Sequence, residues 1–249
     1  MKRKLTAILW FFALCAVLLS ACAAKAPMEP MTITVISRVY AEVEPEKVQA
    51  LHLAVESCEG LTEIGEIDPH DRKTYRVVYD KDKRDYVYKS VHVEDKVYAY
   101  PDAGYPNLVV ALVDGEPVIF QFCNFVGNGE AELETIYGAI SPDTIDRIEI
   151  CAYHREVERN TEVTISDKQD LAAFCDAYHV ELPVYELIAA ERSDPEADLD
   201  YPQYSVTINL TNGFFIDLCC YPRQYALHCA NRWYPCSEQL REWFESHAK

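Results

Sequence analysis

The sequence predicts an α+β fold, made mainly of antiparallel sheet with helices packed on one face. Short runs in which apolar and polar residues alternate are typical of half-buried strands. The dipeptides Asp114-Gly115 and Asn212-Gly213 each lie between two such runs, as in tight hairpins. Three further segments carry apolar residues at helical spacing. With 49% hydrophobic and 12% aromatic residues, the chain has enough core-forming material to exclude a wholly disordered protein.

The first half should begin with a strand at residues 32–40, where the sequence alternates. Pro45 fits the first turn of a helix, and Gly60 fits its end. The apolar face of this helix would hold Val48, Leu51, Val55 and Cys58. Tyrosines and valines then alternate on both sides of the charged segment 81–85, which predicts a hairpin. Strands at 107–113 and 116–123 should form the next hairpin around Asp114-Gly115.

The second half predicts the order strand, strand, helix, strand, strand, helix. The expected strands are 146–153, 162–166, 205–211 and 214–220, the last two joined by a turn of the same kind as at Asp114-Gly115. Ser166 or Asp167 should cap the first helix by accepting free backbone N–H bonds. Its apolar stripe would be Leu171, Phe174, Cys175 and Tyr178. The last helix opens at 235–237, with Leu240, Trp243, Phe244 and His247 on one face.

The N-terminal segment predicts export. Lys2, Arg3 and Lys4 precede an apolar run at 5–19. As a helix that run rises only ~22 Å, which is short of the ~30 Å hydrocarbon core of a bilayer. The residues that follow, Leu19-Ser20-Ala21-Cys22, resemble a bacterial lipobox.

Resemblance to bacterial lipoproteins implies a diacylglyceryl group on Cys22 and cleavage between Ala21 and Cys22. Residues 1–21 would then be a lipoprotein signal peptide, and residues 22–31 a lipidated tether in which prolines disfavour helix. Two acyl chains suffice for stable anchoring, so the expected location is the extracytoplasmic face of the cell membrane. The alternatives are a plain secretory signal and an uncleaved anchor.

We expect an N-terminal α+β region at residues 32–140 and a C-terminal α+β region at residues 141–249, as two small domains or as one larger domain. Their similar hairpins hint that the two regions are related halves. The segments 145–150, 163–178 and 205–218 resemble the small α+β domains of uncharacterised Gram-positive lipoproteins. That resemblance implies no particular activity.

The chain is strongly acidic. Its formal charge is −18, and removal of residues 1–21 with their three basic side chains makes it −21. This charge argues against nucleic acid as a partner, because nucleic-acid binding needs a basic footprint. The most acidic stretch, 191–200, lacks the glycine and the terminal glutamate of a calcium loop, since Leu199 and Ser205 occupy those positions when Asp194 is the first ligand. We interpret it as a solvated loop.

Eight cysteines follow Cys22, and their even number permits disulfides outside the cytoplasm. A local bridge between Cys229 and Cys236 is one possibility. Cys58 and Cys175 lie on apolar helix stripes, where thiols act as small hydrophobic groups. The spacing of Cys219, Cys220, Cys229 and Cys236 matches no zinc pattern, so no metal site is predicted.

Seven tyrosines fall between residues 75 and 105. Such aromatic residues suit a surface that binds peptides or sugars, but they also suit half-buried antiparallel strands, which we favour from sequence alone.

We therefore expect a non-catalytic binding or interaction domain with no cofactor, held at the membrane by its lipid and facing an envelope protein or peptide. Motifs of phosphate loops, nucleophile elbows and metalloproteases do not occur in the sequence. The alternative is an envelope hydrolase or thiol enzyme whose site forms only in three dimensions. That alternative requires a histidine beside Cys219, Cys220 or Cys229, or beside a carboxylate pair.

Overall fold

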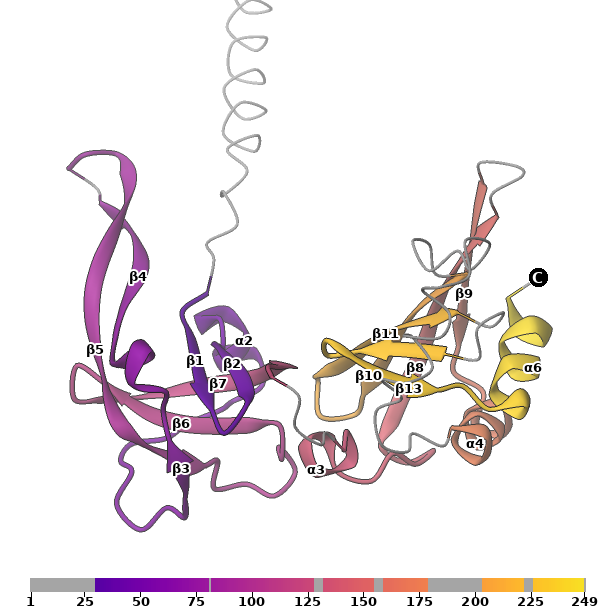
Figure 1. The fold of residues 1–249 in the computed structure, drawn as a ribbon, viewed down its shortest axis with the longest axis horizontal. Coiled ribbons are helices and arrows are strands. Elements are labelled where there is room, and N and C mark those ends of the chain that lie inside the picture. Colours follow the sequence, from indigo (N-terminus) through magenta and orange to yellow (C-terminus); the bar gives the residue numbers. More distant parts are fainter. Residues whose placement is uncertain are drawn as a thin grey trace, which may run out of the picture.

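A computed structural model describes residues 30–80, 82–127, 132–154, 159–178, 203–221 and 226–248 (Figure 1). The described chain is mostly antiparallel sheet, arranged as two sheets with few helices. The predicted antiparallel sheet is therefore confirmed, whereas the helix content is lower than the α+β prediction implied. Among the described residues, none of the helices has the length and apolar character needed to cross a bilayer.

The first sheet uses seven strands in the order β1-β2-β7-β6-β5-β3, and β4 pairs with β5 alone. These strands are β1 (Thr32–Val35), β2 (Arg38–Glu42), β3 (Glu63–Glu66), β4 (Lys73–Asp80), β5 (Asp85–Ala99), β6 (Leu108–Val113) and β7 (Glu116–Phe125). The strand β5 is unusually long, so its first part forms a hairpin with β4 while its second part lies between β3 and β6. Its register shifts between Val93 and Val97.

The second sheet has six strands in the order β13-β12-β11-β10-β8-β9. These are β8 (Ile145–His154), β9 (Arg159–Ile165), β10 (Tyr204–Leu210), β11 (Phe215–Tyr221), β12 (Ala226–Cys229) and β13 (Arg232–Pro235). The helices α4 (Lys168–Ala177) and α6 (Glu238–His247) contact each other and lie on one side of this sheet (Figure 1). The predicted packing of helices on one face holds for this sheet.

Three other helical segments among the described residues are short: α2 (Pro45–Ala50), η1 (Pro69–Arg72) and α3 (Glu134–Tyr137). Both longer helices begin at side-chain caps. Asp167 accepts hydrogen bonds from two backbone N–H groups of α4, and Ser237 accepts one from Leu240 of α6. Of the two caps considered for α4, the structure selects Asp167.

The predicted strand at 32–40 is two strands instead of one. Ile36 and Ser37 have φ of 45° and 61°, so the chain reverses between β1 and β2. Positive φ at both central positions is the geometry of a tight hairpin turn, which Asn-Gly usually signals and Ile-Ser does not. The alternation of apolar and polar residues at 32–40 therefore continues through the turn and does not reveal it.

The predicted helix from Pro45 to Gly60 is also wrong in length, because α2 ends at Ala50. His52 takes the left-handed conformation, with φ of 54°. The backbone N–H of Leu53 donates to the carbonyl of Val48, and that of His52 donates to Gln49, which is the Schellman pattern that closes a helix. Beyond α2, Leu53 is buried in a small apolar cluster that includes Phe214, and Leu51 and Val55 pack against this cluster.

Both Gly-containing hairpin turns are present, but they differ in type. Asp114 and Gly115 both have positive φ, whereas of Asn212 and Gly213 only the glycine does. The N–H of Leu210 donates to the carbonyl of Phe214, which makes the second turn longer than the first. The sequence also missed the β12–β13 hairpin, whose turn at Ala230 and Asn231 has positive φ at both residues.

The two sheets share one continuous cluster of buried side chains. A second, smaller cluster forms where Phe214, from the β10–β11 hairpin, packs among four apolar residues of the first half: Val43, Leu53, Leu108 and Ile119. The amide of Asn212 also donates a hydrogen bond to the carbonyl of Gly104, 2.9 Å away. The tip of the β10–β11 hairpin is therefore bound to the first half of the chain.

Candidate functional site

The most exposed aromatic surface of the described chain lies on the β4–β5 hairpin, which projects away from the rest of the first sheet (Figure 1). Cross-strand pairing aligns Val77 with Tyr88 and Tyr79 with Tyr86. Because side chains alternate between the faces of a strand, Tyr75 shares the face of these pairs. We call the four residues Tyr75, Tyr79, Tyr86 and Tyr88 the tyrosine face.

The tyrosine face is open to solvent. Tyr75, Tyr79 and Tyr88 keep 62%, 51% and 74% of their surface exposed. Tyr86 is half-buried and meets the ring of Tyr79 edge to face, with 5.3 Å between the centroids. Rings that are held in place and exposed together offer a large contact area with little loss of side-chain entropy on binding.

The opposite face of the hairpin is fixed to the body of the protein. Arg76 donates two hydrogen bonds to the carboxylate of Glu42 in β2, with Nε and Nη2 at 3.0 and 2.7 Å from its oxygens. Both side chains are largely shielded from water, which strengthens a paired geometry of this kind. Val91 is buried on the same face of the hairpin. This anchoring leaves the tyrosines turned outward.

The hairpin is basic although the chain is acidic. Residues 73–89 contain six lysine and arginine side chains and three aspartates, in a protein whose net charge is −18. Lys83 and Arg84 lie at its tip and are exposed. The hairpin that carries the tyrosine face therefore has a net positive charge in its sequence, which favours acidic partners.

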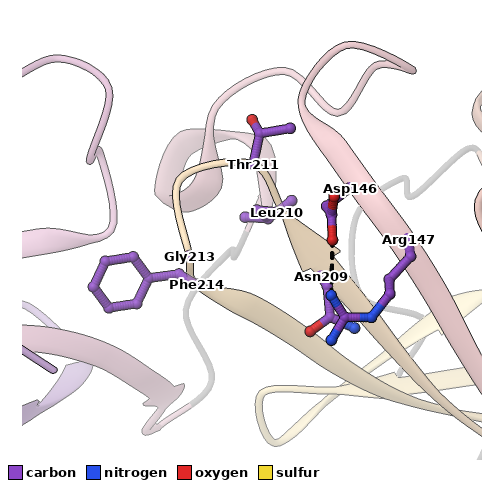
Figure 2. Close-up of a pocket in the computed structure, with 7 residues that line it drawn as sticks. All are labelled: Asp146, Arg147, Asn209, Leu210, Thr211, Gly213 and Phe214. Carbon is purple, nitrogen blue, oxygen red and sulfur yellow. Dashed lines mark hydrogen bonds and ion pairs between the residues drawn. The ribbon is translucent and has the colours of Figure 1, made fainter. Parts of the chain in front are cut away.

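A second feature is an open hollow of about 420 Å³ beside the β10–β11 turn (Figure 2). It is lined by Asp146, Arg147, Asn209, Leu210, Thr211, Gly213 and Phe214. Arg147 lies 2.7 Å from carboxylate oxygens of both Asp146 and Glu149, and these contacts raise its pKa. The charged groups at this hollow are therefore already paired with one another, which makes it a poorer ligand site than the tyrosine face.

The thiol-enzyme hypothesis predicted a histidine beside one of the clustered cysteines, and the register does place Cys219 opposite His228. Burial, with a further contribution from Asp217, raises the pKa of the Cys219 thiol. Burial also lowers the pKa of His228, whose ring packs 4.8 Å from that of Trp233. Both shifts favour neutral groups, whereas thiol catalysis needs a thiolate beside an imidazolium.

None of the eight cysteines within the described ranges is bridged in this structure. Cys229 and Cys236, which the sequence suggests as a pair, are both buried, and the sulfur 3.9 Å from Cys236 Sγ belongs to Cys220. Burial raises the pKa of Cys229 to about 12. Over the part of the chain that the structure describes, three or more His, Cys, Asp or Glu side chains never gather as metal ligands would.

Several sequence predictions lie outside the described residues: the signal peptide 1–21, the lipidation site Cys22, the tether as far as residue 29 and the acidic loop 191–200. The tyrosine face was visible in the sequence as a concentration of tyrosines, but alternation alone favoured half-buried strands. Two sequence features could have favoured a binding surface over half-buried strands. Tyrosines alternate in register on both sides of the turn at 81–85, and basic residues are in excess around them.

Comparison of the chain with protein-family models, curated proteins and solved structures found no match.

Proposed function

We propose that the protein is a lipid-anchored, extracytoplasmic binding protein that acts without catalysis. Residues 1–21 serve as its signal peptide, and Cys22 carries the lipid at the outer side of the cell membrane. The tyrosine face contacts an acidic surface of an envelope protein. The observation that carries this proposal is the outward position of Tyr75, Tyr79 and Tyr88 on a projecting hairpin.

Three physical arguments support a protein partner. Soluble proteins rarely leave several large aromatic rings exposed together unless the surface binds something. Tyrosine is enriched at protein interfaces and among the residues that contribute most to binding. The basic residues of the hairpin would speed association with an acidic partner and weaken it at high salt.

The test uses a photoreactive phenylalanine analogue placed at position 88 of the full chain in its own cells. The matched control places the analogue at position 153, since Tyr153 is also exposed, at 40%, but belongs to β8 in the second sheet. We expect irradiation to give a protein adduct from position 88 only. Substitution of Tyr75→Ser on the same chain should reduce the adduct at least several-fold, and high salt should reduce it further.

Equal adducts from positions 88 and 153, or an adduct unchanged by Tyr75→Ser, would contradict the proposal. Because Tyr75 is exposed, Tyr75→Ser should leave the fold intact, which circular dichroism can verify.

A further inference from the structure

Two thiols meet beneath α6 in the second sheet. Cys220 belongs to β11, and Cys236 immediately precedes Ser237, the N-terminal cap of α6. Their sulfur atoms are 3.9 Å apart. Cys220 is fully buried, and Cys236 is 3% exposed. A disulfide has its sulfurs about 2 Å apart, so formation of the bond would bring the two sulfurs roughly 2 Å closer together.

The surroundings explain why a bond at this place would matter. Cys220 pairs in register with Tyr204 of β10, and the ring of Tyr204 stacks on Phe244 of α6 with 5.5 Å between centroids. Cys220 therefore lies on the face of the sheet that α6 covers, and Cys219 lies on the other face. A bond to Cys236 would join the start of α6 to the sheet beneath it.

We propose that Cys220 and Cys236 form a native disulfide that fixes the N-terminus of α6 to β11. This modification goes beyond the proposed binding function. It shares only one premise with that function, which is that export brings the chain into an oxidising compartment.

The oxidant is a disulfide, either a small-molecule disulfide or the disulfide of an oxidase. The thiolate of Cys236 attacks one oxidant sulfur, so that a mixed disulfide forms and the first oxidant thiolate leaves. The thiolate of Cys220 then attacks the sulfur of Cys236, and the second oxidant thiolate leaves. Two cysteine thiols lose two electrons and two protons, and the oxidant disulfide gains them as two thiols.

Both thiols are buried in the folded protein, so the oxidant reaches Cys236 during folding, before α6 covers the sheet. Docking of α6 then brings Cys220 to the mixed disulfide, and the bond between Cys220 and Cys236 closes.

Trypsin separates the relevant cysteines. Cleavage after Arg192, Arg223, Arg232 and Arg241 places Cys219 and Cys220 in peptide 193–223, Cys229 in 224–232 and Cys236 in 233–241. The full chain is refolded with a mixture of reduced and oxidised glutathione, alkylated under denaturing conditions and digested without reductant. We expect 193–223 linked to 233–241, with one alkyl group on Cys219. Apart from that group, its mass should be about 2 Da below the sum of the two reduced peptides.

The variants Cys219→Ser and Cys220→Ser form a matched pair of neighbouring substitutions. The linked peptide should persist in the first and disappear in the second. Reduction should lower the melting temperature of the wild type and of Cys219→Ser by roughly 5 °C or more. If Cys220→Ser does not fold, fragmentation of the wild-type linked peptide assigns the bond directly.

A link between 224–232 and 233–241, which is the Cys229–Cys236 bridge suggested by the sequence, would overturn the proposal. Alkylation of both Cys220 and Cys236 in the refolded protein would do so as well. Because the refolding reaction supplies the oxidant, its result is independent of export and of the tyrosine face. A refolded protein without the Cys220–Cys236 bond would therefore contradict the disulfide proposal and leave the proposed binding function untouched.

Discussion

The ammonium nitrogen of Lys47 lies 4.0 Å from the ring centroid of Phe214. Lys47 belongs to α2 in the first half of the chain, and Phe214 belongs to the β10–β11 hairpin in the second half. Burial lowers the pKa of Lys47, against an opposing contribution from Glu44. A cation over an aromatic ring in a partly buried place is a favourable contact. It supplements the apolar packing that surrounds Phe214.

Phe214 should therefore dominate the contact between the β10–β11 hairpin and the first half. We expect Phe214→Ala to lower the free energy of unfolding by about 3–5 kcal/mol, because it leaves a cavity among four apolar neighbours. Chemical denaturation measures this change. The neighbouring Phe215 is 41% exposed, so Phe215→Ala should lower the unfolding free energy by less than about 1 kcal/mol. Equal losses from the two substitutions would show that Phe214 has no special packing role.

The ion pair between Arg76 and Glu42 should hold the β4–β5 hairpin in place. We expect Arg76→Gln to lower the unfolding free energy by about 1 kcal/mol and to speed amide hydrogen exchange in β4. Lys96→Gln removes an exposed pair with Glu63 in the same sheet and should leave exchange in β4 unchanged. Unaltered exchange after Arg76→Gln would mean that the hairpin does not depend on this anchor.

Protonation of His228 should make the fold less stable in mild acid. Burial lowers the pKa of His228 in the folded protein, whereas in the unfolded chain it is about 6.5. As pH falls below that value, the unfolded state binds the proton first, so the free energy of unfolding decreases. We expect the decrease between pH 7 and pH 5 to be smaller in His228→Gln than in the wild type.

Urea titrations at several pH values measure this dependence. The same substitution at the exposed His70 controls for the removal of one imidazole. Parallel pH profiles for the wild type and His228→Gln would contradict the prediction.

Cys22→Ser should abolish lipid attachment and release the protein from membranes. The lipid is expected on the thiol of residue 22, and serine offers no thiol for a thioether. Metabolic labelling with a palmitate analogue, followed by membrane fractionation, measures both effects. Cys15→Ser changes a cysteine within the predicted signal peptide and should leave labelling unchanged. A Cys22→Ser protein that stays labelled and membrane-bound would rule out the lipobox interpretation.

The sequence predicted the elements whose signals are local. The Asp114-Gly115 turn takes positive φ at both residues, as this dipeptide favours, and Asp167 and Ser237 cap their helices through side chains that reach neighbouring N–H groups. Each of these signals lies within a few residues, so the surrounding fold was not needed to recognise it.

The turns that the sequence missed depend on contacts from distant residues. The N–H of Val126 donates to the carbonyl of Ser37, and the N–H of Phe125 donates to that of Ala230. The end of β7 therefore binds both unpredicted turns, at Ile36-Ser37 and at Ala230-Asn231. These tertiary hydrogen bonds stabilise the positive φ of the two turns, so the local dipeptides did not predict them.

The candidate sites also combine features that are visible in the sequence with features that depend on the tertiary structure. A concentration of tyrosines can be read directly from the sequence, but their exposure depends on which elements cover each face of the hairpin. The approach of Cys220 to Cys236 requires α6 to dock on the second sheet, and sequence distance favoured the nearer Cys229.

The β4–β5 hairpin continues directly into the first sheet, because β5 runs without interruption from Asp85 to Ala99. The same strand carries half of the tyrosine face and lies between β3 and β6 in the body of the first sheet. A load applied at Tyr88 is therefore transmitted along one backbone into the part of that sheet between β3 and β6. The irregular pairing between Val93 and Val97 is the place where such a load would bend the strand.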